Sequence, residues 1–234
     1  MDNNIDFNTY LYISSKKIIL LVSEKKNFQI LLRKEKLFND TSNEIPFKKI
    51  DQFLEENIYL IEKNLKSFIS KVYLIFKSDD FFPIYISFKQ KNYETLISQK
   101  NLNYLLNEAQ NQCKKTMEGK KIIHMLVDDY LIDGEHYNFF PNKKKCNSFS
   151  VDVRFICLSK NLIKMFEEIL KKYQISLSQI LDANYLESFL NEEDVDIFKV
   201  GNKVIYGFNE NEVKITDKIL NKKGIFERFF DLFR

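Results

Sequence analysis

The first third of the chain most constrains the fold. Its apolar residues first alternate as in β-strands, then recur at helical spacing, and then form a short strand-like run. Residues 9–23 predict two short strands around a polar turn at 14–17, and residues 27–34 alternate as a third strand. Apolar residues then recur at helical spacing between about 47 and 69, and the run at 72–76 predicts a buried strand. The expected order is therefore β-β-β-α-β.

A second set of elements follows on a smaller scale. A strand at 83–91 precedes a helix for which Ser98 is a plausible N-cap. Strands at 122–132 and 150–158 come next, and another helix completes the set. We expect a compact β-α-β-β-α unit over residues 83–172.

The chain then continues with further short elements. Residues 175–182 predict a strand, and residues 183–190 predict a short helix. Two more strands are expected at 195–200 and 203–208, with a turn at Gly201-Asn202 between them.

The last eleven residues, 224–234, predict an amphipathic helix after a polar connector at 209–223. Wound as a helix, the segment gathers its bulky apolar residues within an arc of roughly 160°. Such a face flanked by cations is typical of a helix that lies in a membrane interface. The alternative is a terminal helix that folds back onto the domain. The expected membrane-anchor residues are Ile225, Phe226, Phe229, Phe230, Leu232, Phe233, Lys222, Lys223 and Arg228.

Composition limits the class of protein. The 234 residues carry 36 Lys and Arg against 33 Asp and Glu, and this near balance argues against a nucleic-acid-binding protein. Three cysteines without a C-x-x-C pair favour a reducing compartment. With no evident signal peptide and no long apolar run, we expect a cytoplasmic protein whose membrane contact is peripheral.

The residues that could bind a metal or take part in catalysis do not form a recognisable motif. His124 and His136 lack a third ligand at metal-binding spacing, and the aspartates at 128, 129 and 133 are best interpreted as solvated. No G-x-S-x-G motif surrounds a serine. We therefore expect no catalytic, metal or cofactor site.

Several segments in shared order resemble FtsA, the actin-like protein that tethers the bacterial division ring to the membrane. Residues 122–134 look like the family's strand ending in a V-D-G turn, and 151–173 look like its next strand and helix. Residues 179–188 stand where the family returns to its actin-like core.

This resemblance implies an α/β (α+β) fold with a partial ribonuclease-H/actin-like lobe, residues 1–82 and 173–208. Residues 83–172 would be an inserted SHS2-type subdomain. Most of the second actin-like lobe would then be missing, and we expect a reduced FtsA-like protein.

The chain departs from the family at its two phosphate-binding turns. Tyr12 stands at the position of the Mg²⁺-organising Asp, and Ser14 stands at the position of a Gly. The second turn is replaced by 191–194, whose carboxylates would repel a triphosphate. We expect neither ATP binding nor ATPase activity.

The resemblance implies a non-enzymatic adaptor in cell division, anchored peripherally to the inner-membrane lipid surface at the septum. Among divisome partners, an FtsN-type tail is favoured over FtsZ, because FtsZ binds mainly the missing lobe in the family. One alternative is a PilM-like cytoplasmic adaptor of a pilus or secretion system, a family that binds a short N-terminal peptide of an inner-membrane partner. The other is a divergent ATP-binding actin-like protein.

Overall fold

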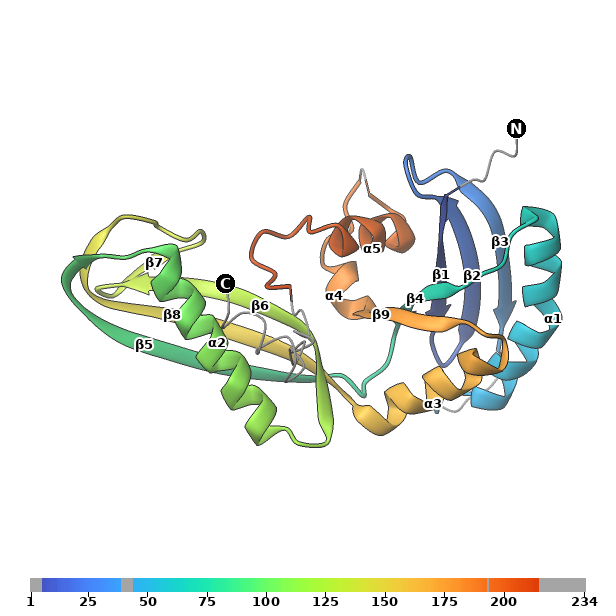
Figure 1. The fold of residues 1–234 in the computed structure, drawn as a ribbon, viewed down its shortest axis with the longest axis horizontal. Coiled ribbons are helices and arrows are strands. Elements are labelled where there is room, and N and C mark those ends of the chain that lie inside the picture. The colour runs from blue at the N-terminus through green and yellow to red at the C-terminus, as the bar shows by residue number, and fades with distance from the viewer. Residues whose placement is uncertain (1–5, 39–43, 193, 215–234) are drawn as a thin grey trace, which may run out of the picture.

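The computed structural model describes residues 6–38, 44–192 and 194–214, and these form two β-sheets with helices packed on them. The two sheets lie at opposite ends of an elongated molecule (Figure 1). In the described ranges no helix has the length and apolar character needed to cross a bilayer. The nine predicted membrane-anchor residues all lie outside the described residues: Lys222, Lys223, Ile225, Phe226, Arg228, Phe229, Phe230, Leu232 and Phe233.

The first sheet has five strands in the order β3-β2-β1-β4-β9. These strands are β1 (Phe7–Ile13), β2 (Lys17–Glu24), β3 (Ile30–Leu37), β4 (Lys71–Phe76) and β9 (Ser176–Asp182). β2 is antiparallel to both of its neighbours, whereas β1, β4 and β9 run parallel. This order and direction are those of a ribonuclease-H/actin-like lobe, as the sequence analysis expected.

Helices cover both faces of this sheet. α1 (Phe47–Leu65) and α3 (Lys160–Lys172) share one apolar core with it, and α4 (Ala183–Glu187) and α5 (Ile197–Ile205) share the core on the other face. Side chains alternate between the faces along each strand, which is why both cores draw on the same strands.

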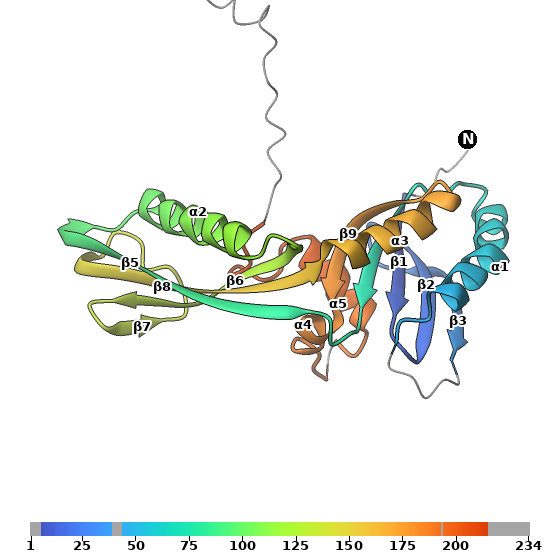
Figure 2. The same ribbon diagram turned by 90° about the horizontal axis from the view of Figure 1, so that it is seen from below.

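The second sheet has four antiparallel strands in the order β5-β8-β6-β7. They are β5 (Phe82–Leu96), β6 (Lys120–Ile132), β7 (Glu135–Tyr137) and β8 (Lys145–Ser159). α2 (Gln99–Thr116) lies along one face and closes a third core there (Figure 2). We call this four-stranded sheet with α2 the inserted unit, and the five-stranded sheet with its helices the lobe.

The packing of α3 assigns this helix to the lobe. Phe166 packs against Phe76 of β4 with ring centroids 5.1 Å apart, and against Phe47 of α1 at 5.3 Å. The sequence analysis grouped this helix with the inserted unit in residues 83–172. In the structure the inserted unit ends with β8 at Ser159.

The prediction of two strands at 195–200 and 203–208 is wrong, because α5 occupies this segment. The helix begins after Asp196, whose side chain accepts the N–H of Phe198 at 2.9 Å. An aspartate at the N-cap is a strong helix-start signal.

Gly201 lies within α5 and allows close packing instead of forming a turn. A Cβ at this position would lie 3.1 Å from the Ile75 side chain and 3.3 Å from the Leu186 side chain. The next residue, Asn202, accepts a hydrogen bond from the Tyr10 hydroxyl at 2.6 Å. Contacts with the sheet therefore explain both residues of the expected turn.

Residues 209–214, which we call the C-terminal strap, pack along β6. The Val127 N–H donates to the Asn211 carbonyl at 2.9 Å, and the Val213 N–H donates to the Met125 carbonyl at 2.8 Å. Leu126 and Glu212 form an antiparallel bridge between them. The first part of the predicted connector at 209–223 is therefore fixed to the inserted unit.

Candidate functional site

The turn between β1 and β2 is the first of the expected phosphate positions, and its amides are already paired. The Ser14 N–H donates to the Lys17 carbonyl at 2.9 Å. Its hydroxyl oxygen accepts the N–H groups of Lys16 and Lys17 at 3.3 and 3.1 Å. Tyr12 is buried beside this turn, and burial raises the pKa of its hydroxyl. The N–H groups of Ser14, Lys16 and Lys17 are therefore paired within the turn, and the turn has no carboxylate for a Mg²⁺-nucleotide.

The second expected phosphate position is used for ion pairs within the lobe. Asp194 pairs with Lys203 and lies 3.2 Å from Lys199. The hydrogen bonds from Lys203 and then Lys199 lower the pKa of Asp194. Asn191 closes the loop by accepting the Asp194 N–H at 2.8 Å. The described residues at both turns are bonded within the lobe and do not fit a nucleoside triphosphate.

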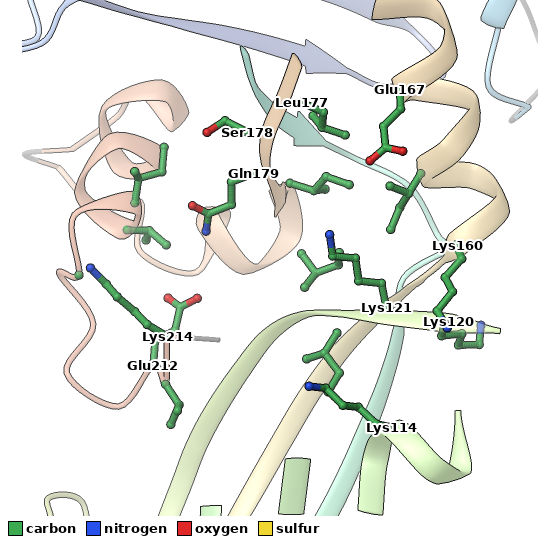
Figure 3. A pocket seen from close by; sticks show the side chains of 18 residues that line it. Lys114, Lys120, Lys121, Lys160, Glu167, Leu177, Ser178, Gln179, Glu212 and Lys214 are labelled. Atoms are coloured by element: carbon green, nitrogen blue, oxygen red, sulfur yellow. The ribbon is translucent and has the colours of Figure 1, made fainter. Parts of the chain in front are cut away.

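A groove of about 580 Å³ lies between the lobe and the inserted unit (Figure 3). Its walls come from the end of α2, the start of β6, α3, β9, the end of α5 and the C-terminal strap. Five lysines and two glutamates supply its charged side chains: Lys114, Lys120, Lys121, Lys160, Lys214, Glu167 and Glu212. Figure 3 shows Lys121 of β6 and Glu167 of α3 directed into the space. The groove is thus basic on balance.

A buried hydrogen-bond network includes Glu212 of the groove lining. His124 is 1% exposed, and its Nδ1 lies 2.7 Å from Oε1 of Glu212. The Asp182 N–H donates to His124 Nε2 at 3.1 Å, so the proton of the neutral ring is on Nδ1 and points to Glu212. The Tyr185 hydroxyl donates to Oε2 of Glu212, and Asn209 donates to that hydroxyl, both at 2.9 Å. The network joins the inserted unit, the lobe and the strap.

The two histidines of the sequence analysis are not brought together. His124 belongs to this network, whereas His136 on β7 pairs with Asp129. Asp128 pairs with Arg154 at 2.9 Å. The Asp133 carboxylate accepts the backbone N–H groups of Asn147 and Ser148. No group of three metal-ligating side chains occurs in the part of the chain that the structure describes.

The three cysteines are free thiols in buried positions. Cys113 of α2 and Cys157 of β8 are both buried, with Sγ atoms 4.0 Å apart. Burial is the main reason why the pKa of Cys157 is raised to about 12. A thiol in such surroundings is a poor nucleophile, since the thiolate is the reactive form.

Local sequence patterns did not predict the groove or the hydrogen-bond network that includes Glu212 of its lining. Lys121, Lys160 and Lys214 come from three elements, and Glu212 lies 88 positions after His124. No local spacing connects such residues. The one local signal is a basic start to both β6 and α3, which an abundance of lysine in the chain conceals.

The fold and the groove together define an incomplete actin-like lobe that carries an inserted α+β unit. No family model matches the sequence, and no curated protein matches it.

Several solved structures are similar to it. One is the cytoplasmic domain of EpsL, an inner-membrane component of the type II secretion system of Vibrio cholerae. The match has 10% identity, covers 80% of this chain and 61% of that one, and has a TM-score of 0.41. Another is a PilM–PilN type IV pilus biogenesis complex, with 7% identity, 78% and 49% coverage and a TM-score of 0.45. A third is a Bacteroides thetaiotaomicron protein with an actin-like ATPase fold and unknown function, with 14% identity, 81% and 58% coverage and a TM-score of 0.35.

The chain thus spans between about half and three-fifths of the length of these proteins. These similarities do not show the activity or the partners of this chain. The resemblance to FtsA stays a prediction.

Proposed function

We propose that this chain is a non-enzymatic adaptor that holds a segment of a partner protein in the groove between its lobe and its inserted unit. The observation that carries the proposal is a contrast between two places in one lobe. At the β1–β2 turn the Ser14 hydroxyl pairs the amides that a nucleotide would need, whereas the groove beside β9 is open and lined by charged side chains.

The groups that could perform catalysis have structural partners, which supports a binding role. His124 is buried between Glu212 and the backbone of Asp182. Cys113 and Cys157 are buried against each other. A nucleophile needs an adjacent base and access to substrate, and none of these groups has both.

The proposed place of action is the cytoplasmic face of an inner membrane. The support is the amphipathic pattern of residues 224–234, which follows the strap closely in the chain. Because the strap is bonded to β6 beside the groove, an anchor at 224–234 would hold the groove near the lipid surface.

Of the two systems considered, we favour a PilM-like adaptor of a pilus or secretion machine. EpsL is named as an inner-membrane component of a secretion system, and PilM is named in a complex with PilN. A groove between lobe and inserted unit suits an adaptor of this kind, which takes a short peptide of a membrane partner.

The second candidate is an FtsA-like adaptor in cell division. The segments at 122–134, 151–173 and 179–188 favour it, together with the tail at 224–234. An FtsN-type tail would then be the favoured partner, as the resemblance implies.

Capture of partners from detergent-solubilised membranes of the source cells tests the adaptor role. Ser178 is exposed on β9 in the groove, and Ser87 is exposed on β5 away from it. We expect Ser178→Trp to lose a partner that both the wild type and Ser87→Trp retain. Identical partners in all three samples would contradict the proposal. A fluorescent fusion then separates the systems, since midcell bands indicate division and other envelope foci indicate a pilus or secretion machine.

A further inference from the structure

Among the described residues, the groove carries five lysines against two glutamates. Its lysines at 114, 120, 121, 160 and 214 have no ion-pair partner among the described residues. Lysines elsewhere, such as Lys77 and Lys172, do have one. Glu212 offsets one of these five charges, and its two oxygens accept from His124 and Tyr185. Glu167 is the other acidic side chain in the lining.

One wall of the groove is the edge of a sheet. β9 is the last strand of its sheet and pairs with β4 on one side. On its other side the Asp182 N–H meets His124, which shows the direction of the backbone groups at this position. Since backbone groups alternate along a strand, the N–H and carbonyl of Ile180 point the same way, into the groove. Ser178 has no partner residue on β4, because the register shifts there.

An open strand edge and unpaired cations side by side define the chemistry of a ligand. A peptide that adds to a sheet edge is held by main-chain hydrogen bonds, and its side chains give specificity. The lysines are spread over four segments around a space of about 580 Å³, which is far larger than one phosphate group. Dispersed ammonium groups suit several carboxylates along a strand better than one converged anion.

The chain's own tail is a poor occupant on charge grounds. Residues 215–234 contain five cations, Lys218, Lys222, Lys223, Arg228 and Arg234, against three acidic side chains, Asp217, Glu227 and Asp231. A basic segment beside five unpaired lysines would be repelled.

We infer that the groove takes an acidic, extended segment of a partner protein, which adds to β9 as a further strand and places its carboxylates among Lys114, Lys120, Lys121, Lys160 and Lys214. This inference rests on the proposed adaptor function and specifies the chemistry of the partner.

Fluorescence anisotropy on the full chain tests both halves of the inference. The probe is a fluorescein-labelled peptide of alternating Val and Glu, compared with Val-Gln and Val-Lys peptides of equal length. Two exposed groove lysines are reversed in Lys121→Glu with Lys160→Glu. The matched control reverses two exposed lysines of β5 in Lys89→Glu with Lys91→Glu, outside the groove lining.

We expect the Val-Glu peptide to bind about tenfold more tightly than the Val-Gln peptide, and to weaken as salt is added. The groove variant should lose about tenfold in affinity, whereas the control variant should stay within about twofold of wild type. A Val-Glu peptide with N-methyl groups at alternate residues keeps its charges but loses strand hydrogen bonds. It should also bind about tenfold more weakly.

Equal binding of the Val-Glu and Val-Gln peptides, or equal losses in the two variants, would overturn the acidic chemistry. Unchanged binding of the N-methylated peptide, or displacement by inorganic phosphate at matched concentration, would overturn strand addition. The adaptor function is judged separately in the same variants. If Ser178→Trp loses the captured membrane partner while Lys121→Glu with Lys160→Glu retains it, the adaptor role stands and the acidic chemistry is wrong. If neither variant loses it, the adaptor role itself is contradicted.

Discussion

His124 Nδ1 lies 2.7 Å from Oε1 of Glu212, so a histidine of the inserted unit is bonded to a residue of the strap 88 positions later in the chain. The same ring accepts the N–H of Asp182 at the end of β9. Three segments that are distant in sequence therefore meet on one imidazole. This contact holds the inserted unit against the lobe next to the groove.

Replacing His124 tests this structural role. In His124→Ala, the Asp182 N–H loses its buried acceptor and Glu212 loses a donor, which should cost about 2 kcal/mol of unfolding free energy. Urea denaturation should show a lower midpoint with an unchanged slope.

The other histidine of the chain supplies the control for this substitution. His136 has a 69% exposed side chain and pairs with Asp129 at the surface. His136→Ala should change the unfolding free energy by less than about 0.5 kcal/mol. A loss as large as that of His124→Ala would contradict the role assigned to the buried ring.

Asp182 predicts a pH dependence of stability. Its side chain is 5% exposed and accepts the Asn184 N–H at 2.9 Å. Burial, the largest cause, raises the pKa of Asp182 above 3.8, although the hydrogen bond from the Asn184 N–H acts in the opposite direction. The folded state therefore holds this proton more strongly than the unfolded state, and the contribution of Asp182 to stability falls as pH rises from 3.8 through the folded-state pKa.

Asp182→Asn removes this titration and keeps an oxygen for the Asn184 N–H. Its stability relative to wild type should rise as the pH increases from 3.8 through the raised folded-state pKa of Asp182, and then level off. Paired urea denaturations across this range measure the difference and cancel the opposite effect of Asp51 and Asp194, whose pKa values are lowered by lysine partners. A difference that is constant with pH would refute the assignment.

The β1–β2 turn predicts the absence of nucleotide binding. Because the Ser14 hydroxyl already accepts from Lys16 and Lys17, calorimetric titration with Mg-ATP should give no binding heat. Ser14→Ala should lower the unfolding free energy by about 1 kcal/mol, since two turn amides lose their partner. Micromolar binding of Mg-ATP by the wild type would contradict this account of the turn.

The sequence predicted the elements whose signals are local. The hairpin around Ser14 follows from alternating apolar residues on both sides of a polar turn. The helix that starts after Ser98 follows from its cap, whose backbone N–H donates to Asn101 at 3.0 Å. These features depend on neighbours in the chain, so a pattern of a few residues contains them.

Local sequence patterns are misleading where a residue makes a contact with a distant part of the chain. Gly201 and Asn202 resemble a turn, but Gly201 allows α5 to approach Ile75 and Asn202 binds Tyr10. The groove could not be predicted for the same reason, because its lysines become neighbours only when β6, α3 and the strap assemble.

The membrane anchor predicted at 224–234 would bind vesicles through its phenylalanines. Partial burial of six large apolar side chains, at about 1.5–3 kcal/mol each when complete, supports weak, reversible attachment. Phe229→Glu with Phe230→Glu should abolish co-sedimentation with anionic liposomes.

Two phenylalanines elsewhere on the surface give a matched control. Phe68 and Phe139 are 84% and 67% exposed in the described part of the chain. Phe68→Glu with Phe139→Glu adds the same charges and should pellet like wild type. Equal pelleting of both double variants would contradict the predicted membrane anchor.

The central claim, that the groove beside β9 receives a partner, is tested most directly by site-specific photo-crosslinking in cells. A benzophenone amino acid is placed at the exposed Lys114 at the end of α2, in the groove lining, or at the exposed Lys89 on β5 outside it. The account predicts a discrete cross-linked species from position 114 that is not formed from position 89. This species should disappear when Lys121 and Lys160 are both changed to Glu. The same species from both positions, or none from position 114, would contradict the account.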